Sequence, residues 1–319
     1  MEDLARSALA HRDTGSRAVV ARAVALDGFG SRRLGETALI DALGLVTGRL
    51  LGGAADEALV AAAGQQLSGA AETRLVDVRI GEDAAVTAGL ACGGSARLLV
   101  QDLSLVPTAW WEARLTRRPA ALLSPLGGAP ARVVTDRDGP DGGLLADGAS
   151  RTEVVEPEGG PVSVIEVFWP TTRAVVIGAA ELASALRGQA GLLGWETVLD
   201  DGTDPAGAAT LAGGLGPADA LIVLTHDPEV ATPALAAGLR SAGFVGALGS
   251  RTTQANRRAR LRTAGLDEAT VGRLHGPVGL DLGARTPEEQ ALAICAEIVA
   301  SRGGRGGAPL TGGAGPING

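Results

Sequence analysis

Gly246-Ala247-Leu248-Gly249-Ser250-Arg251, in the last third of the chain, is the stretch that decides the fold. Apolar residues typical of a β-strand end there in a glycine-containing turn, and an arginine-rich helix is expected to follow. A second glycine-rich stretch, residues 277–284, leads into Thr286-Pro287-Glu288-Glu289, which has the pattern of a helix start. Together these stretches place backbone N–H groups, arginines and carboxylates along one loop-lined edge of a sheet, where α/β proteins bind phosphorylated ligands.

Strands and helices alternate through the rest of the second half of the chain, from Arg173 onward. The apolar pattern predicts strands at 174–177, 197–199, 220–224 and 244–248, with helices at 182–193 and 233–242. This alternation is typical of a doubly wound parallel sheet. We therefore expect a Rossmann-like domain over residues 171–302, followed by a flexible glycine-rich tail over 303–319.

The first half of the chain mixes strand and helix patterns, and residues 127–160 form a stretch rich in glycine, proline and aspartate. Strands are expected at 18–26, 43–46, 74–78, 96–100 and 162–168, and a helix at 54–67. This order predicts an N-terminal α+β domain over residues 1–170. The fold class we expect is thus α/β, with an α+β domain followed by a Rossmann-like domain.

Bulk composition excludes several classes of protein. A formal charge of −8 over 319 residues, with 2% aromatic residues, argues against a nucleic-acid binder, because such a protein needs a basic surface and stacking platforms. No apolar run approaches the roughly 18–20 residues of a membrane span. Met1-Glu2-Asp3-Leu4 lacks the pattern of a signal peptide, so we expect a cytoplasmic protein with no membrane span.

An anion site is expected where the strand at 244–248 ends. Ser250, Thr252 and Thr253 are all candidate helix N-caps, and Arg251 adds a guanidinium beside the N-terminal helix dipole. The alternative is a solvated basic helix face, which accounts for some of the later arginines at 257, 258, 260 and 262.

A dinucleotide fingerprint has a partial match in Gly178-Ala179-Ala180-Glu181, with the acidic Asp200 about 20 residues later. The Cβ of Ala180 fills the space that the second glycine of the fingerprint leaves for a pyrophosphate, and Glu181 adds an anion beside it. The residues therefore disfavour NAD(P).

Other polar residues carry weaker signals. Cys92, in the turn 89–94, is either a buried thiol or an exposed one whose pKa nearby amides lower, as a nucleophile or sulfur carrier needs. His226 and Asp227 are either an acid–base pair or a helix cap with a histidine packed beside it. His275, before Gly276 and Pro277, carries no strong signal.

The helix after Thr286 is explained by stability alone. Thr286 is the expected N-cap, and Glu289 completes a capping box. One apolar face is predicted from helical spacing, with Cys295 as an inert core thiol within it: Ala291, Leu292, Cys295, Ile298 and Val299.

Taken together, these motifs resemble the XdhC/CoxI family, accessory proteins of xanthine dehydrogenase and aerobic carbon monoxide dehydrogenase. The resemblance spans nearly the whole chain and is strongest over residues 224–310. It rests on Thr225-His226-Asp227, residues 246–251, 277–284 and 286–289, Ala296-Glu297-Ile298 and, in the first domain, residues 30–35 and 89–94.

The resemblance implies a two-domain protein that binds molybdenum cofactor, protects it while its terminal sulfur is installed, and delivers it to a molybdenum hydroxylase. A cysteine desulfurase is a further implied partner, and a homodimer the implied assembly. The cofactor-binding residues would be Gly178, Cys92, His226 and Asp227, Gly249, Ser250 and Arg251, with Arg32 and Arg33 closing from the first domain.

Two loops depart from the usual family pattern. A serine-glycine-glycine-cysteine segment reads Leu51-Gly52-Gly53-Ala54 here, and glycine-alanine-glycine-histidine reads Gly178-Ala179-Ala180-Glu181. Two rival functions therefore stay open. One is an NAD(P)-dependent oxidoreductase that uses the Rossmann half, and the other is a cofactor-free assembly factor that docks the apo-dehydrogenase.

Overall fold

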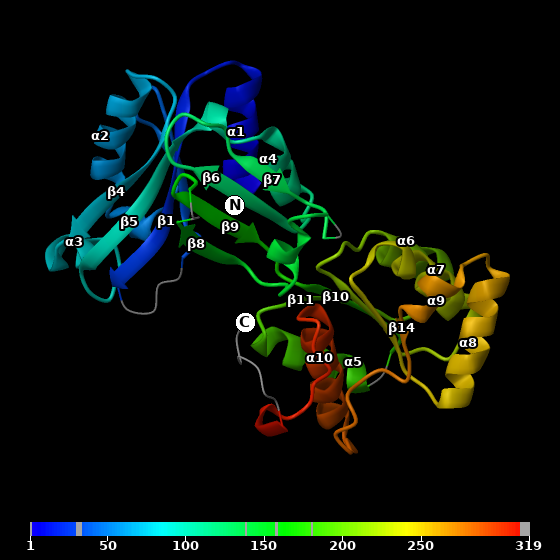
Figure 1. The fold of residues 1–319 in the computed structure, drawn as a ribbon. Coiled ribbons are helices and arrows are strands. Elements are labelled where there is room, and N and C mark those ends of the chain that lie inside the picture. Colours follow the sequence, from blue (N-terminus) through cyan, green and yellow to red (C-terminus); the bar gives the residue numbers. More distant parts are fainter. Residues whose placement is uncertain (1, 30–33, 138, 157–158, 180, 313–319) are drawn as a thin grey trace. The chain divides into compact units, whose positions relative to one another are not determined.

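The computed structural model describes residues 2–29, 34–137, 139–156, 159–179 and 181–312. The chain folds into two compact units. The first comprises residues 1–145 and 149–169, and the second comprises residues 146–148 and 170 onward. Figure 1 shows the sheets of the first unit in blue to green and the sheet of the second in green to orange.

The first unit is built on two antiparallel sheets with the strand orders β3-β2-β1-β5-β4 and β7-β6-β9-β8. Its elements are α1 (Glu2–Asp13), β1 (Ala18–Gly28), β2 (Thr37–Asp41), β3 (Val46–Gly48), α2 (Asp56–Leu67), β4 (Thr73–Ile80), α3 (Glu82–Thr87), β5 (Gly94–Asp102), α4 (Thr108–Leu115), β6 (Ala120–Pro125), β7 (Arg132–Val134), β8 (Arg151–Val155) and β9 (Ser163–Phe168).

Strand β1 is apolar along most of its length because both of its faces are buried. Val19, Ala21 and Ala23 join a core that includes residues of α2 and α3. Ala18 and Val20 point the other way, into a core shared with α1, α4 and the second sheet. Alternation along a strand thus places β1 between two apolar layers, which explains a continuous apolar run in an antiparallel sheet.

A buried ion pair connects the two antiparallel sheets. Arg22 of β1 and Glu166 of β9 have 1% and 6% of their surface exposed, and their Nη1 and Oε2 atoms are 2.9 Å apart. Arg22 also donates to Gln101 of β5. Burial lowers the pKa of Arg22 and the Glu166 carboxylate opposes that effect. The charge on Arg22 is therefore stable inside the unit because the Glu166 carboxylate lies beside it.

The second unit is a five-stranded parallel sheet in the order β11-β10-β12-β13-β14. Its elements are β10 (Arg173–Ile177), α5 (Glu181–Leu192), β11 (Glu196–Asp200), α6 (Pro205–Gly213), β12 (Ala220–Val223), α7 (Pro228–Ser241), β13 (Phe244–Ala247), α8 (Arg251–Thr263), α9 (Glu268–Gly272), β14 (Leu274–His275) and α10 (Pro287–Arg302).

Helices cover both faces of this sheet. On one face, Val175 and Leu221 pack in a core with residues of α6, α7, α8 and α9. On the other, Ala174 and Ile222 pack with α5 and α10, which lie side by side in Figure 1. The expected fold class is confirmed: an N-terminal α+β part precedes a doubly wound, Rossmann-like sheet.

Three expectations about local structure were wrong. The predicted strand at 43–46 is mostly the turn between β2 and β3, where Leu43 is 94% exposed. Pro233 lies inside α7 rather than at its start, because Pro228 occupies the first turn. On α10, Leu292 and Val299 are exposed, and the buried face carries Ala291, Ala293, Ile294, Cys295 and Ile298.

Along the described part of the chain, every helix is too short or too polar to span a bilayer.

Candidate functional site at the carboxyl edge of the parallel sheet

The strand order reverses direction beside β10, whose neighbours are β11 on one side and β12 on the other. The loops after β10 and β12 therefore leave the sheet in opposite directions, and the gap between them is where doubly wound folds bind ligands. Gly178 follows β10 with φ of 117°, and a Cβ there would lie 2.7 Å from the Thr225 nitrogen. Only glycine fits, so bare backbone lines this point of the edge.

Asp200 at the end of β11 takes part in its own loop. Its Oδ1 accepts from the N–H of Gly202 at 2.9 Å, and its carbonyl accepts from the N–H of Gly178, also at 2.9 Å. The acidic residue of the partial dinucleotide fingerprint thus holds two loops together. Ala180, which would fill the pyrophosphate space, lies outside the described residues, and Glu181 is the exposed first residue of α5.

Ser250 caps α8 after the strand β13. Its Oγ accepts from the N–H of Thr253 at 3.2 Å, so Ser250 is the N-cap among the three candidates. Gly249 before it has φ of 126°, and Arg251, the first helical residue, is exposed. The loop therefore presents a helix N-terminus with a guanidinium in solvent beside it, which suits an anion.

Arg257 is buried, so the interpretation of the later arginines as a solvated face is wrong at this position. Its Nη2 donates to the carbonyl of Thr225 at 2.7 Å, and its Nη1 donates to the carbonyl of Leu248. Burial lowers its pKa, and the charge of Arg260 lowers it further. Arg257 thereby fastens the loop after β12 to the loop after β13. Its signal in the sequence is helical spacing, since Gln254, Arg257 and Leu261 form the buried face of α8.

Asp227 is a helix cap, as the structural alternative expected. Its Oδ1 accepts from the N–H of Glu229 at 2.9 Å at the start of α7. His226 is exposed and not packed beside the cap, which corrects that part of the structural alternative. The imidazole therefore lies in solvent at the same edge as Gly178, because the N–H of the preceding Thr225 donates to the carbonyl of Ile177 at 3.3 Å.

A pocket of about 270 Å³ opens beside the second glycine-rich stretch. It is lined by Leu248, residues 278–284, Gln290, Ala293 and Ile294. Backbone hydrogen bonds hold the first half of this stretch: the N–H of Val278 donates to Ala247 and that of Leu280 to Ala293, both at 3.1 Å. The loop is thus fixed between β13 and α10.

His275, which carries no strong signal in the sequence, pairs with Glu297 of α10. Nδ1 of His275 lies 2.8 Å from Oε1 of Glu297, whose Oε2 accepts from the N–H of Gly279 at 2.6 Å. Phe244 stacks on the imidazole with ring centroids 4.3 Å apart. Burial acts to raise the pKa of Glu297, but the hydrogen bonds from His275 and Gly279 outweigh it and leave the pKa below its usual value.

The remaining predicted site residues belong to the first unit. Cys92 is exposed, as one alternative expected, whereas Cys295 is buried in α10 with its pKa raised to about 11 by burial. Arg32 and Arg33 lie outside the described residues. The stretch where the family usually has a cysteine folds into successive left-handed turns, with φ of 51° at Leu51 and 67° at Gly52.

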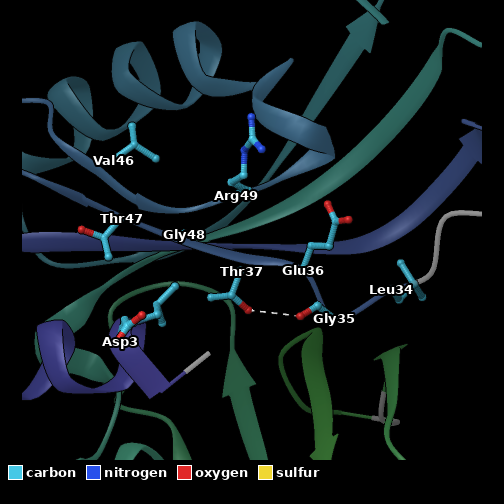
Figure 2. Close-up of a pocket in the computed structure, with 10 residues that line it drawn as sticks. Asp3, Leu34, Gly35, Glu36, Thr37, Val46, Thr47, Gly48 and Arg49 are labelled. Atoms are coloured by element: carbon cyan, nitrogen blue, oxygen red, sulfur yellow. Dashed lines mark hydrogen bonds between the residues drawn. The ribbon is translucent and has the colours of Figure 1, made fainter. Parts of the chain in front are cut away.

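A larger pocket, of about 730 Å³, lies in the first unit beside β2 and β3. Figure 2 shows Glu36 and Arg49 pointing to one side of these strands and Asp3 lying on the other, with Thr37 donating to the carbonyl of Gly35 at 3.4 Å. The Glu36 carboxylate is engaged, because its Oε2 accepts from the N–H of Leu51 at 2.6 Å. Within the described ranges, no group of three or more histidine, cysteine or acidic residues could hold a metal ion.

Comparison with known proteins adds three findings. The family model described as the XdhC Rossmann domain matches residues 174–298. The uncharacterized protein YqeB of Escherichia coli (strain K12) is 30% identical over 162 residues, which cover 44% of this chain and 29% of that protein. A crystal structure titled a xanthine dehydrogenase, from Bacillus halodurans, covers 97% of this chain and 98% of its own, with 18% identity and a TM-score of 0.44.

The matched residues run from β10 to α10 and contain the whole carboxyl edge described above, including Gly178, Thr225, Ser250 and Glu297. Less than a third of the length of YqeB is matched. Residues 174–298 of this chain therefore form a Rossmann domain of the XdhC type.

Proposed function

We propose that this protein binds molybdenum cofactor as cargo and delivers it to a molybdenum hydroxylase of the xanthine or carbon monoxide dehydrogenase type. The observation that carries the proposal is the meeting of the loops after β12 and β13, which Arg257 ties together beside an open helix N-terminus. Molybdopterin carries a phosphate, and this edge offers N–H groups and a guanidinium to receive it.

Local and overall charge act differently on such a ligand. The chain has a formal charge of −8, so an anion is not drawn to it in general. Arg251 is exposed at the start of α8, and Arg257 keeps its charge beneath the same loop with carbonyl partners. These two guanidinium groups give the edge a local positive charge, which favours an anionic group there.

The chain offers few residues that could bind the molybdenum and sulfur end of the cofactor. The chain has two cysteines, and the one in the Rossmann unit, Cys295, is buried in a helix core. A thiol for sulfur or molybdenum would have to be Cys92 of the first unit or come from a partner, such as a cysteine desulfurase. The Rossmann edge accordingly supports recognition of the organic part of the cofactor, through phosphate and ring.

Purification from a host that makes the cofactor tests the proposal. Pterin is measured by fluorescence after oxidation, and molybdenum by elemental analysis, for the wild type, Arg251→Ala and Arg187→Ala. Arg187 is an exposed arginine of α5 and serves as the matched control. We expect stoichiometric pterin in the wild type and the control, and at least tenfold less in Arg251→Ala, because a charge-assisted phosphate contact contributes about 1.5–3 kcal/mol.

Two outcomes would replace this proposal. Tight binding of NAD(P) in a titration, with no copurified pterin, would favour the oxidoreductase. Capture of the apo-dehydrogenase by pterin-free protein, at the same yield for Arg251→Ala, would favour a cofactor-free assembly factor.

A further inference from the structure

We propose that the pocket beside the second glycine-rich stretch binds a 2-amino-4-oxopyrimidine ring, and that the carboxylate of Asp281 reads its N–H edge. This ring edge is shared by pterin and guanine. The inference rests on the proposed function and names the part of the ligand that the Rossmann unit recognises. Nothing in the family match assigns a role to Asp281.

The size and walls of the pocket suit one flat ring system. Its volume of about 270 Å³ lies just below the roughly 300–1,000 Å³ typical of ligand pockets, so it has room for a bicyclic head and not for a whole dinucleotide. Val278 and Ile294 form buried apolar walls, with 9% and 1% of their surface exposed. A heteroaromatic ring would bury its faces against such walls.

The charged group at this pocket has the sign that the ring edge needs. Asp281 is the charged residue among those that line the pocket, and Gln290 adds a neutral amide. A carboxylate can accept two parallel N–H bonds, one from the ring N3–H and one from the 2-amino group. A phosphate would be repelled there, which separates the ring pocket from the anion site.

The two sites are continuous along the chain. Leu248 lines the pocket and is followed directly by Gly249 and Ser250 of the anion loop. A ligand that carries both a ring and a phosphate would therefore place the two groups at neighbouring segments of this edge.

The pocket is held in shape before any ligand arrives. Glu297 accepts from the N–H of Gly279 at 2.6 Å, and Leu280 donates to Ala293 at 3.1 Å. These bonds fix the loop directly before Asp281, which reduces the ordering left for the binding step.

Paired ligands that differ by one amino group test the inference with the full-length protein. Binding of guanosine and inosine, and of pterin and pteridin-4(3H)-one, is measured by calorimetry for the wild type, Asp281→Asn and Glu288→Gln. Glu288 is an exposed carboxylate of α10 outside the pocket lining and is the matched control. We expect the wild type and the control to prefer the amino-bearing ligand of each pair at least tenfold, because a lost N–H leaves the carboxylate unpaired. In Asp281→Asn the preference should fall below threefold.

Tighter binding of pterin than of guanosine would assign the pocket to the pterin head, and the reverse order would assign it to a guanine base. Equal binding of guanosine and inosine by the wild type, or an unchanged preference in Asp281→Asn, would overturn the inference.

The inference and the proposed function can fail separately. Copurified pterin that depends on Arg251, without the ring preference, would leave the function standing and remove the ring pocket. A ring preference lost in Asp281→Asn, without copurified pterin, would keep the pocket and remove the cofactor chaperone.

Discussion

Arg251 and Arg257 begin from the same chemistry and end in opposite roles within α8. The Arg257 guanidinium is buried and holds two loop carbonyls, and the Arg251 guanidinium is in solvent at the helix start. Position on the helix decides the difference, because Arg257 shares the inward face with Leu261. One arginine shapes the edge and the other remains available to a ligand.

The two thiols should differ sharply in reactivity. A thiol reagent at mildly alkaline pH should modify one cysteine per native chain, because Cys92 is exposed and burial raises the pKa of Cys295 to about 11. Both should react after unfolding. The Cys92→Ser variant should lose the fast reaction, and a fast reaction that persists in it would show that the core around α10 opens readily.

Glu297→Gln should change how stability depends on pH. The folded-state pKa of Glu297 lies below its ordinary value of 4.5, so its contribution to stability is full above that pH and is lost as the pH falls through the lowered pKa. We expect the variant to be about 1–2 kcal/mol less stable at neutral pH, with the difference shrinking on acidification. Urea unfolding across this range measures it, and a constant difference would contradict the assignment.

At the scale of elements, the glycine after β10 should resist substitution. Gly178→Ala combines φ of 117° with a Cβ that would lie 2.7 Å from the Thr225 nitrogen, so we expect a loss of about 2–4 kcal/mol. Gly188→Ala is the matched control, because Gly188 lies exposed within α5 and a Cβ there would meet nothing within 4 Å. That control should gain about 0.5–1 kcal/mol, since alanine favours a helix. Equal changes in stability for Gly178→Ala and Gly188→Ala would show that the backbone around Gly178 is not crowded.

The elements of the Rossmann unit were predictable where pattern and burial agree. Strand β12 is buried along its whole length, so its apolar run was unambiguous. Strand β14 has two residues, too short for a periodic signal, and it escaped prediction.

In the first unit, the strand expected at 43–46 was wrong because Leu43 and Leu45 are apolar yet exposed, and sequence alone does not report exposure.

The candidate site was predictable in part for the same reason. Caps have local signatures, so Ser250, Asp227 and Thr286 could be identified from their neighbours in the chain. Contacts between distant segments have none. Arg257 reaches Thr225, and Glu297 reaches His275 and Gly279, only once the sheet brings their strands together.

At the scale of the molecule, the stability of the first unit should depend on the buried ion pair between Arg22 and Glu166. Glu166→Gln leaves Arg22 charged inside the unit without its carboxylate partner, and we expect a loss of about 3–5 kcal/mol. Replacing both residues, with Arg22→Met and Glu166→Leu, should restore most of the lost stability. Denaturant unfolding followed by tryptophan fluorescence measures the effect, because Trp110 and Trp111 are buried in the same unit. A mild effect of the single change would show that water reaches the pair.

The crowded backbone at Gly178 also bears on how such a protein can evolve. At Gly178 two segments of main chain pack against each other, so almost any side chain there would disrupt the turn and few substitutions are tolerated. Variation is left to the exposed positions around it, among them His226, Arg251 and Asp281. Substitution of a few surface residues would thus change the chemistry of this edge, with the architecture that presents them inherited intact.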